Sequence, residues 1–214
     1  MSEKKIASYG SWKSPITSDL IVSATIGLGQ IAIDGDDICW VETRPVEKGR
    51  YVVVERAPDG QTVDLTPSPF NARTRVHEYG GGSFVMSDGV VWFSNFADQR
   101  LYRKDAGAEP QAITPEADLR YADGIIDQFR NRMICVREDH TIAGSEATNT
   151  IVSLPLDGAG EQRVLVSGND FYSSPRLSPD GSRLATGSGD GSAYIWDGIA
   201  GIHRSPLPQC PLRP

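Results

Sequence analysis

Short apolar segments separated by turn residues run along most of the chain, and long stretches with helical periodicity are nearly absent. The segments are rich in Val, Ile, Trp, Tyr and Phe, and clusters of Gly, Pro, Asp and Ser lie between them. This pattern is typical of β-strands joined by tight turns, so it predicts an all-β protein. The expected strands are 30–35, 37–44, 50–57 and 61–66, then 82–87, 89–96, 99–105 and 110–114, then 122–129, 132–139, 149–156 and 161–167.

The expected strands fall into sets of four that end in a similar way. DLTP at 64–67, AITP at 112–115 and LVSG at 165–168 close the first three sets, which gives a repeat of roughly 50 residues. Four antiparallel strands per repeat are typical of propeller blades, so we predict a partial or four-bladed β-propeller. The expected parts are an N-terminal segment 1–30, blades at about 31–67, 80–115, 120–168 and 171–200, and a tail 201–214.

The tail is expected to be irregular. Its last eleven residues hold four prolines and show no alternation of apolar and polar positions. Proline cannot donate a backbone hydrogen bond to a sheet, so a paired strand is not expected there.

Composition and charge limit the kinds of partner that this protein is expected to bind. Hydrophobic residues make up 39% and charged residues 23%, which is ordinary for a folded protein. The formal charge is -7, and no stretch concentrates Lys and Arg as a nucleic-acid groove would. The first residues lack the apolar core of a secretion signal, and no later apolar run is long enough to cross a bilayer. We therefore expect a cytoplasmic protein that binds neither nucleic acid nor membrane.

The three cysteines, Cys39, Cys135 and Cys210, are widely separated and form no CxxC pair. This spacing indicates reduced thiols rather than a disulfide framework or a metal site. Cys39 lies in the run ICWV and Cys135 in MICV, so both are expected to be small buried hydrophobic residues.

The stretch VHEYGGG at 76–82 is the most unusual in the chain. A glycine loop that binds phosphate leads into a helix, whereas a strand, a turn and another strand are expected here. His77 and Glu78 are neighbours, and on an extended chain their side chains would point to opposite faces, so joint acid–base chemistry is not expected. The glycines are expected to permit positive φ and close backbone approach where the chain enters the inner strand of a blade near a central channel.

No residue pattern points to catalysis or to a bound metal. No serine lies in a Gly-x-Ser-x-Gly elbow, and nothing joins His77, His140 or His203 to a serine in sequence. Glu138 and His140 share a strand face, but two ligands do not make a metal site, and a solvated turn is expected there. The acidic turn 34–37 lacks the ligand spacing of a calcium loop. We therefore assign no catalytic, cofactor-binding or metal-ligating residue, and no cofactor.

Four segments together resemble a known family. They are YGSWKSPIT at 9–17, VHEYGGG at 76–82, VVWFSNFADQRLYR at 90–103 and SSPRLSPDGSRLA at 173–185. These resemble, in order, the N-terminal β-propeller of the prolyl oligopeptidase family of serine peptidases, in its dipeptidyl aminopeptidase/acylaminoacyl-peptidase-like branch. The resemblance implies a propeller that caps an α/β-hydrolase domain and admits short peptides. The family's catalytic serine, aspartate and histidine belong to that other domain, and no position here matches their motifs.

Two functions remain open. The first is the non-catalytic, substrate-gating portion of such a peptidase, with peptides and a hydrolase domain as partners and with self-association through exposed blade edges. The second is a stand-alone interaction scaffold like the WD-repeat proteins. The chain departs from the family pattern after Ala185, and the dipeptide Trp196-Asp197 is typical of the third strand of a WD-repeat blade.

Overall fold

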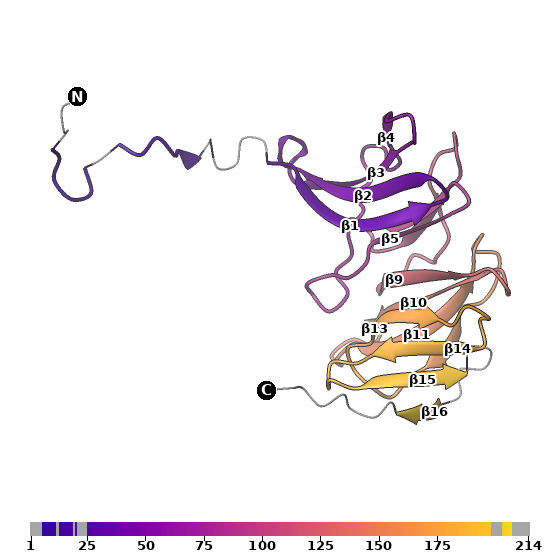
Figure 1. The fold of residues 1–214 in the computed structure, drawn as a ribbon. Helices are drawn as coiled ribbons and strands as arrows, with labels where there is room; N and C mark the ends of the chain where they lie inside the picture. The colour runs from indigo at the N-terminus through magenta and orange to yellow at the C-terminus, as the bar shows by residue number, and fades with distance from the viewer. Residues whose placement is uncertain (1–5, 12, 19, 21–24, 198–202, 207–214) are drawn as a thin grey trace.

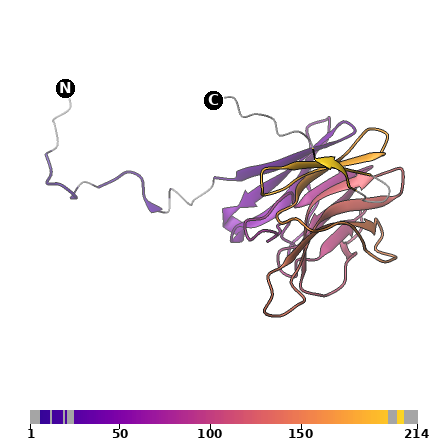
Figure 2. The ribbon, with the colours of Figure 1, turned by 90° about the horizontal axis from the view of Figure 1, so that it is seen from below.

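The computed structural model describes residues 6–11, 13–18, 20, 25–197 and 203–206. It contains four antiparallel sheets of four strands each, and in every sheet the strands follow one another in chain order. The sheets succeed one another around a common axis, and the described residues that precede the first sheet lead away from them (Figures 1 and 2). The protein is a four-bladed β-propeller, as the strand pattern predicts.

The first blade contains β1 (Gly27–Asp34), β2 (Asp37–Arg44), the short 3-10 helix η1 (Pro45–Glu47), β3 (Arg50–Arg56) and β4 (Thr62–Asp64). The second contains β5 (Phe84–Ser87), β6 (Val90–Ser94), β7 (Leu101–Lys104) and β8 (Gln111–Ala112). The third contains β9 (Leu119–Asp127), β10 (Arg132–Asp139), β11 (Thr148–Pro155) and β12 (Arg163–Val166). The fourth contains β13 (Ser173–Leu177), β14 (Arg183–Gly187), β15 (Ala193–Asp197) and β16 (His203–Pro206).

The last strand differs from the sequence expectation. β16 pairs with β15 inside the segment 201–214, where no paired strand was expected. It is an edge strand of four residues that ends at Pro206, and a proline is tolerated at such an edge because its missing N–H removes no bond from a central ladder. Proline is therefore compatible with a short paired strand at this edge.

Apolar clusters fill the spaces between successive blades, because strand residues alternate between the two faces of each sheet. Cys39, Val53 and Phe93 belong to the cluster between the first and second blades. In β10 of the third blade, Cys135 packs toward the second blade and Val136 toward the fourth. The third blade is thus apolar on both faces, and both faces are covered.

The two described cysteines are buried and free. Burial raises the pKa of the Cys39 thiol to about 11 and that of Cys135 to about 12. Both thiols therefore stay protonated and behave as small apolar groups, as expected. Cys210 lies outside the described residues.

The first blade leaves one face uncovered by the described residues. Ile31 and Ile33 are each 73% exposed, and Leu28 is 74% exposed. Ile31 pairs across the sheet with Trp40, whereas the neighbouring Ala32 pairs with the buried Cys39. Because directly paired residues share a face, the exposed isoleucines lie on the face that points away from the second blade.

In the described part of the chain, the structure contains no helix that combines the length and the apolar character needed to cross a membrane.

A cleft around His77 and Glu138

The VHEYGGG segment lies between β4 and β5 and forms a compact turn. His77 has a φ of 56°, Glu78 of 66° and Gly80 of 92°, which places all three in the left-handed region. The Gly80 N–H donates to the Val76 carbonyl at 2.8 Å. The expectation of an extended chain with His77 and Glu78 on opposite faces is therefore wrong. Residues other than glycine adopt this region only when the surroundings hold them there, at a cost of about 1–3 kcal/mol each.

The glycines that follow let this segment approach the inner strand of the third blade. The Gly82 N–H donates to Asp123 Oδ1 at 2.5 Å, and the Asp123 N–H donates to the Gly82 carbonyl at 2.8 Å. A Cβ on Gly82 would lie 2.9 Å from Asp123 Oδ1, which is too close. Asp123 Oδ2 also accepts from the Ser174 N–H of the fourth blade at 2.9 Å. The glycine run therefore gives the expected close backbone approach where the chain enters β5, and the neighbour that it approaches is the inner strand of the third blade.

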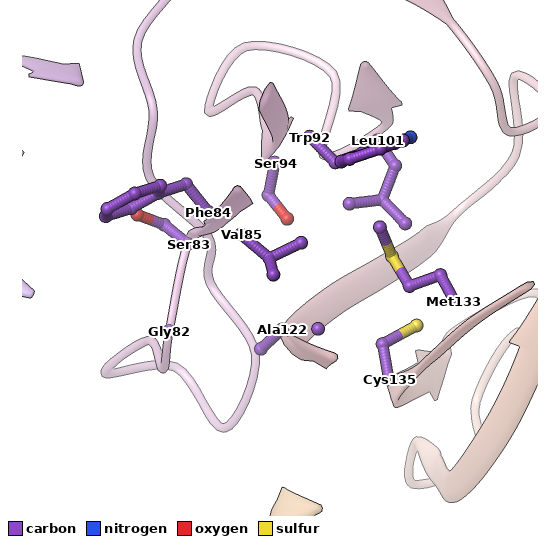
Figure 3. Close-up of a pocket in the computed structure, with 11 residues that line it drawn as sticks. Gly82, Ser83, Phe84, Val85, Trp92, Ser94, Leu101, Ala122, Met133 and Cys135 are labelled. Carbon is purple, nitrogen blue, oxygen red and sulfur yellow. The ribbon is translucent and has the colours of Figure 1, made fainter. Parts of the chain in front are cut away.

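A small cavity lies beside Gly82, between the second and third blades. Figure 3 shows Val85, Leu101 and Met133 converging on it, with Cys135 below. Its volume is about 10 Å³, which is at the lower limit for a single water molecule. This cavity is a gap in the packing and too small for a ligand.

His77 joins three blades through its hydrogen bonds. Its backbone N–H donates to Glu138 Oε1 at 2.8 Å, and its ring Nδ1 lies 3.1 Å from the same oxygen. Ring Nε2 lies 3.0 Å from the Tyr172 carbonyl, just before β13. The His77 side chain is 9% exposed and the Glu138 side chain 6%. The imidazole is thus held between the third and fourth blades by a loop that leaves the first.

Glu138 is the centre of a charged cluster. Its Oε2 lies 3.2 Å from His140 Nε2 and 3.7 Å from Arg120 Nη1. Arg120 Nη1 also lies 2.5 Å from Glu78 Oε1. The expectation that Glu138 and His140 lie in a solvated turn is wrong for Glu138, because the loop from the first blade covers it.

The pKa values follow from these contacts. Burial acts to raise the pKa of Glu138, but hydrogen bonds from His77 and His140 outweigh it and lower that pKa to about 2. Burial acts to lower the pKa of His77, but its bonds with Glu138 and the Tyr172 carbonyl outweigh burial and raise that pKa above its ordinary value. Arg120 lowers the pKa of the exposed Glu78. The geometry therefore favours a Glu138 carboxylate beside a protonated His77.

A cleft of about 550 Å³ opens next to this cluster. Three connecting segments form it: the β4–β5 loop, the β10–β11 loop and the β12–β13 loop. The lining residues are His77, Glu78, Tyr79, Glu138, His140, Glu146, Ala147, Asn149, Asp170 and Phe171. The volume lies within the roughly 300–1,000 Å³ usual for small-molecule sites. We therefore take this cleft as the candidate functional site.

Sequence reasoning placed Glu138 and His140 on one strand face but did not bring His77 to them, and it missed Asn149 and Phe171 altogether. His77 and Glu138 are 61 residues apart and belong to different repeats. The blade order alone contained a usable signal, because loops between blades and loops between the second and third strands of a blade lie at the same end. That rule places 76–80, 140–147 and 167–172 at one end without identifying which side chains meet.

Neither a metal centre nor a hydrolytic triad is built from the described residues. No group of three or more His, Cys, Asp or Glu side chains there is placed to hold a metal ion. The hydrogen bonds of the described His77 and His140 rings go to Glu138 and a backbone carbonyl, not to a serine hydroxyl. The cleft presents carboxylates, imidazoles, aromatic rings and an amide.

The fold is that of a β-propeller, and its loops form this cleft. No protein-family profile matches the sequence, and a search of curated proteins finds no relative. Solved structures do match. A puromycin-hydrolyzing peptidase from Mycobacterium tuberculosis is 35% identical, with a TM-score of 0.83 over 95% of this chain. A puromycin hydrolase is 30% identical, with a TM-score of 0.81 over 94% of this chain.

This chain spans only 35% of the length of each of these two structures. Two more distant structures share the fold alone. TolB from Acinetobacter baumannii is 17% identical, with a TM-score of 0.59 over 85% of this chain and 43% of TolB. The Neurospora crassa Pan2 WD40 domain is 15% identical, with a TM-score of 0.56 over 91% of this chain and 52% of that domain. The resemblance drawn from the four sequence segments is confirmed: the chain matches the propeller portion of a peptidase of the prolyl oligopeptidase family.

Proposed function

We propose that this chain is the non-catalytic, substrate-gating portion of a peptidase of the prolyl oligopeptidase family. The observation that carries the proposal is the match to two puromycin-hydrolysing enzymes over nearly the whole of this chain and about a third of theirs. In the proposed mechanism the propeller admits thin, flexible peptides to a hydrolase domain and excludes folded proteins. The chain by itself would cleave nothing, and the cytoplasm is the compartment that its free, buried thiols favour.

A stand-alone interaction scaffold is the second candidate. Trp196 favours it, because this residue lies in the third strand of the last blade and its indole N–H donates to Thr186 Oγ1 at 2.8 Å. A buried Trp bonded to a hydroxyl on the neighbouring strand stabilises a blade without contributing reactivity. The similarity to peptidases at 30–35% identity outweighs this local feature, since the WD40 likeness shows the fold alone.

The first experiment is enzymatic. The purified chain is incubated with aminoacyl and acyl-aminoacyl chromogenic substrates and with a fluorophosphonate probe for active-site serines. We expect neither turnover nor labelling. Either one would show a nucleophile in this chain and overturn the proposal.

The second experiment tests gating. The chain replaces the matching part of the puromycin-hydrolyzing peptidase in a chimaera, and the fluorophosphonate probe shows that the hydrolase domain is folded. The chimaera is expected to cleave a short peptide and to leave a folded protein intact, whereas the hydrolase domain alone cleaves both or loses its discrimination. A probe-reactive chimaera that degrades the folded protein as readily as the peptide would contradict gating.

A further inference from the structure

The first and fourth blades are the two ends of the series of blades. Contacts join the inner strands of successive blades, β1 to β5, β5 to β9 and β9 to β13. Between β1 and β13 there is no contact of comparable extent, and no hydrogen bond joins these two strands. Each end of the series therefore keeps one sheet face that the described residues do not cover.

The free face of the first blade is bulky and apolar. Leu28, Ile31 and Ile33 are 73–74% exposed on it. Ile38 pairs with Ile33 across the sheet, so it lies on the same face, and it is 43% exposed. Large apolar side chains that lie together on a surface are typical of a site where another protein surface packs.

The free face of the fourth blade carries smaller side chains. Leu184 pairs with Trp196, and both are buried against the third blade. The next residue, Ala185, pairs with Ile195 on the opposite face, where both are only partly buried. Gly187 lies on this face as well, two residues further along β14. This face therefore has room for large side chains to approach its backbone closely.

The covered interface between the first and second blades combines small and large side chains in the same way. Ala32 and Cys39 of the first blade pack there with Phe84 and Phe93 of the second. In that interface the earlier blade contributes the small residues and the later blade the large ones, and such combinations fill space without voids. The free face of the fourth blade matches the first role, and the free face of the first blade matches the second.

We propose that two copies of this chain pair head to tail, with the free face of the first blade of each copy on the free face of the fourth blade of the other. A two-fold axis makes this contact twice, so neither copy keeps a free end. The dimer contains twice the four blades of one chain, which is within the range of about four to eight that closed propellers show. A second copy is the partner because it supplies both complementary faces at once. The inference does not rest on the proposed function.

Association is measured by sedimentation velocity with the whole chain from about 1 to about 300 µM, because mass action favours the dimer as concentration rises. The dilute sample is expected to be monomeric. The concentrated sample is expected to reach twice the 23.2 kDa of one chain and to stop there. Growth stops at two copies because the closed dimer uses every free face.

Variants locate the contact on both blades. The double variant Ile31→Asp/Ile33→Asp in the first blade and Ala185→Glu in the fourth are each expected to weaken dimerisation at least about tenfold. Ile142→Asp replaces a 66% exposed isoleucine in the β10–β11 loop, away from both faces, and should leave dimerisation unchanged. Thermal unfolding of each variant confirms that it is folded.

Mixing the two weakened variants distinguishes head-to-tail pairing from pairing of two first blades. In an equal mixture, the unchanged fourth blade of the Ile31→Asp/Ile33→Asp chain meets the unchanged first blade of the Ala185→Glu chain. One of the two contacts is thus restored. The mixture is expected to dimerise more strongly than either variant alone and less strongly than the wild type.

Four outcomes would overturn the inference. A wild-type chain that stays monomeric would leave the two faces to other parts of a longer protein. Unchanged dimerisation of Ala185→Glu would mean that two first blades pair with each other. A mixture that dimerises no better than its components would exclude head-to-tail contact, and growth beyond two copies would exclude closure. Because these assays need no hydrolase domain, their failure leaves the gating proposal standing, and failure of the chimaera leaves the pairing standing.

Discussion

The first and third blades have the same four-stranded plan but differ in what covers them. Ile134 and Ile151 of the third blade are fully buried against the fourth blade, and Cys135 is fully buried against the second. In the first blade, Cys39 is buried against the second blade, whereas Ile31 and Ile33 on the other face are each 73% exposed. Similar hydrophobic patterns in the two blades thus contribute unequally to the free energy of unfolding, because only apolar area that is removed from water stabilises the fold.

The largest expected effect is at the centre of the third blade. Ile134→Asp places a carboxylate among fully buried neighbours, and we expect it to lower the free energy of unfolding by about 4 kcal/mol or more. The matched change in the first blade, Ile31→Asp, should alter it by less than about 0.5 kcal/mol. Urea unfolding followed by circular dichroism measures both. Equal losses would mean that the first blade is covered as fully as the third.

The next effect concerns the link from the first blade to the third. Glu138→Ala leaves His77 and His140 without their shared carboxylate, and we expect a loss of about 3 kcal/mol. Glu78→Ala removes an exposed carboxylate from the same cluster and should have a much smaller effect. Chemical denaturation compares the two. A small loss in Glu138→Ala would show that the loop around His77 does not contribute to the stability of the third blade.

The stability that the contact between His77 and Glu138 contributes should depend on pH. The lowered pKa of Glu138 contributes stability that is present above its ordinary value of 4.5 and is lost as the pH falls toward about 2. The raised pKa of His77 contributes stability that is present below 6.5 and is lost as the pH rises through its folded value. The difference in unfolding free energy between wild type and Glu138→Ala should therefore be largest at about pH 5.5 and smaller at about pH 9. A difference that grows from about pH 5.5 to about pH 9 would contradict the pairing.

A smaller effect is expected at the glycine run. Gly82→Ala places a Cβ 2.9 Å from Asp123 Oδ1 and should cost about 2 kcal/mol as the loop shifts away from the third blade. Gly29→Ala in the first blade is the control, because its Cβ would meet nothing closer than 3.8 Å. Thermal unfolding distinguishes them. Equal unfolding temperatures for the two variants would mean that the close approach of Gly82 to Asp123 does not contribute to stability.

The smallest effect on stability comes with a change in association. Self-association through exposed blade edges stays a prediction, and the uncovered apolar face of the first blade is a further surface to test for contact with a second copy of this chain. The double variant Ile31→Asp/Ile33→Asp should shift sedimentation velocity profiles toward monomer while leaving the unfolding midpoint nearly unchanged. A wild-type chain that is monomeric at every concentration would refute this prediction.

The sequence predicted the blades well, because alternation and turn residues are local signals. The twelve expected strands of the first three blades all correspond to strands of the structure, and the WD dipeptide correctly placed Trp196 in a third strand. The cleft could not be predicted in the same way. His77 was expected to be extended, but contacts with Glu138 and Tyr172, 61 and 95 residues away, hold it in the left-handed region. Contacts between residues so far apart produce no periodic pattern in the sequence, so they could not be predicted from it.

The most direct test of the account is amide hydrogen exchange of the whole chain, followed residue by residue by NMR. We predict that the amides of β10, the second strand of the covered third blade, exchange only with global unfolding, whereas those of β2, the second strand of the partly uncovered first blade, exchange faster through local opening. Equal protection of the two strands would contradict the account, because the first blade would then be as stable as the third.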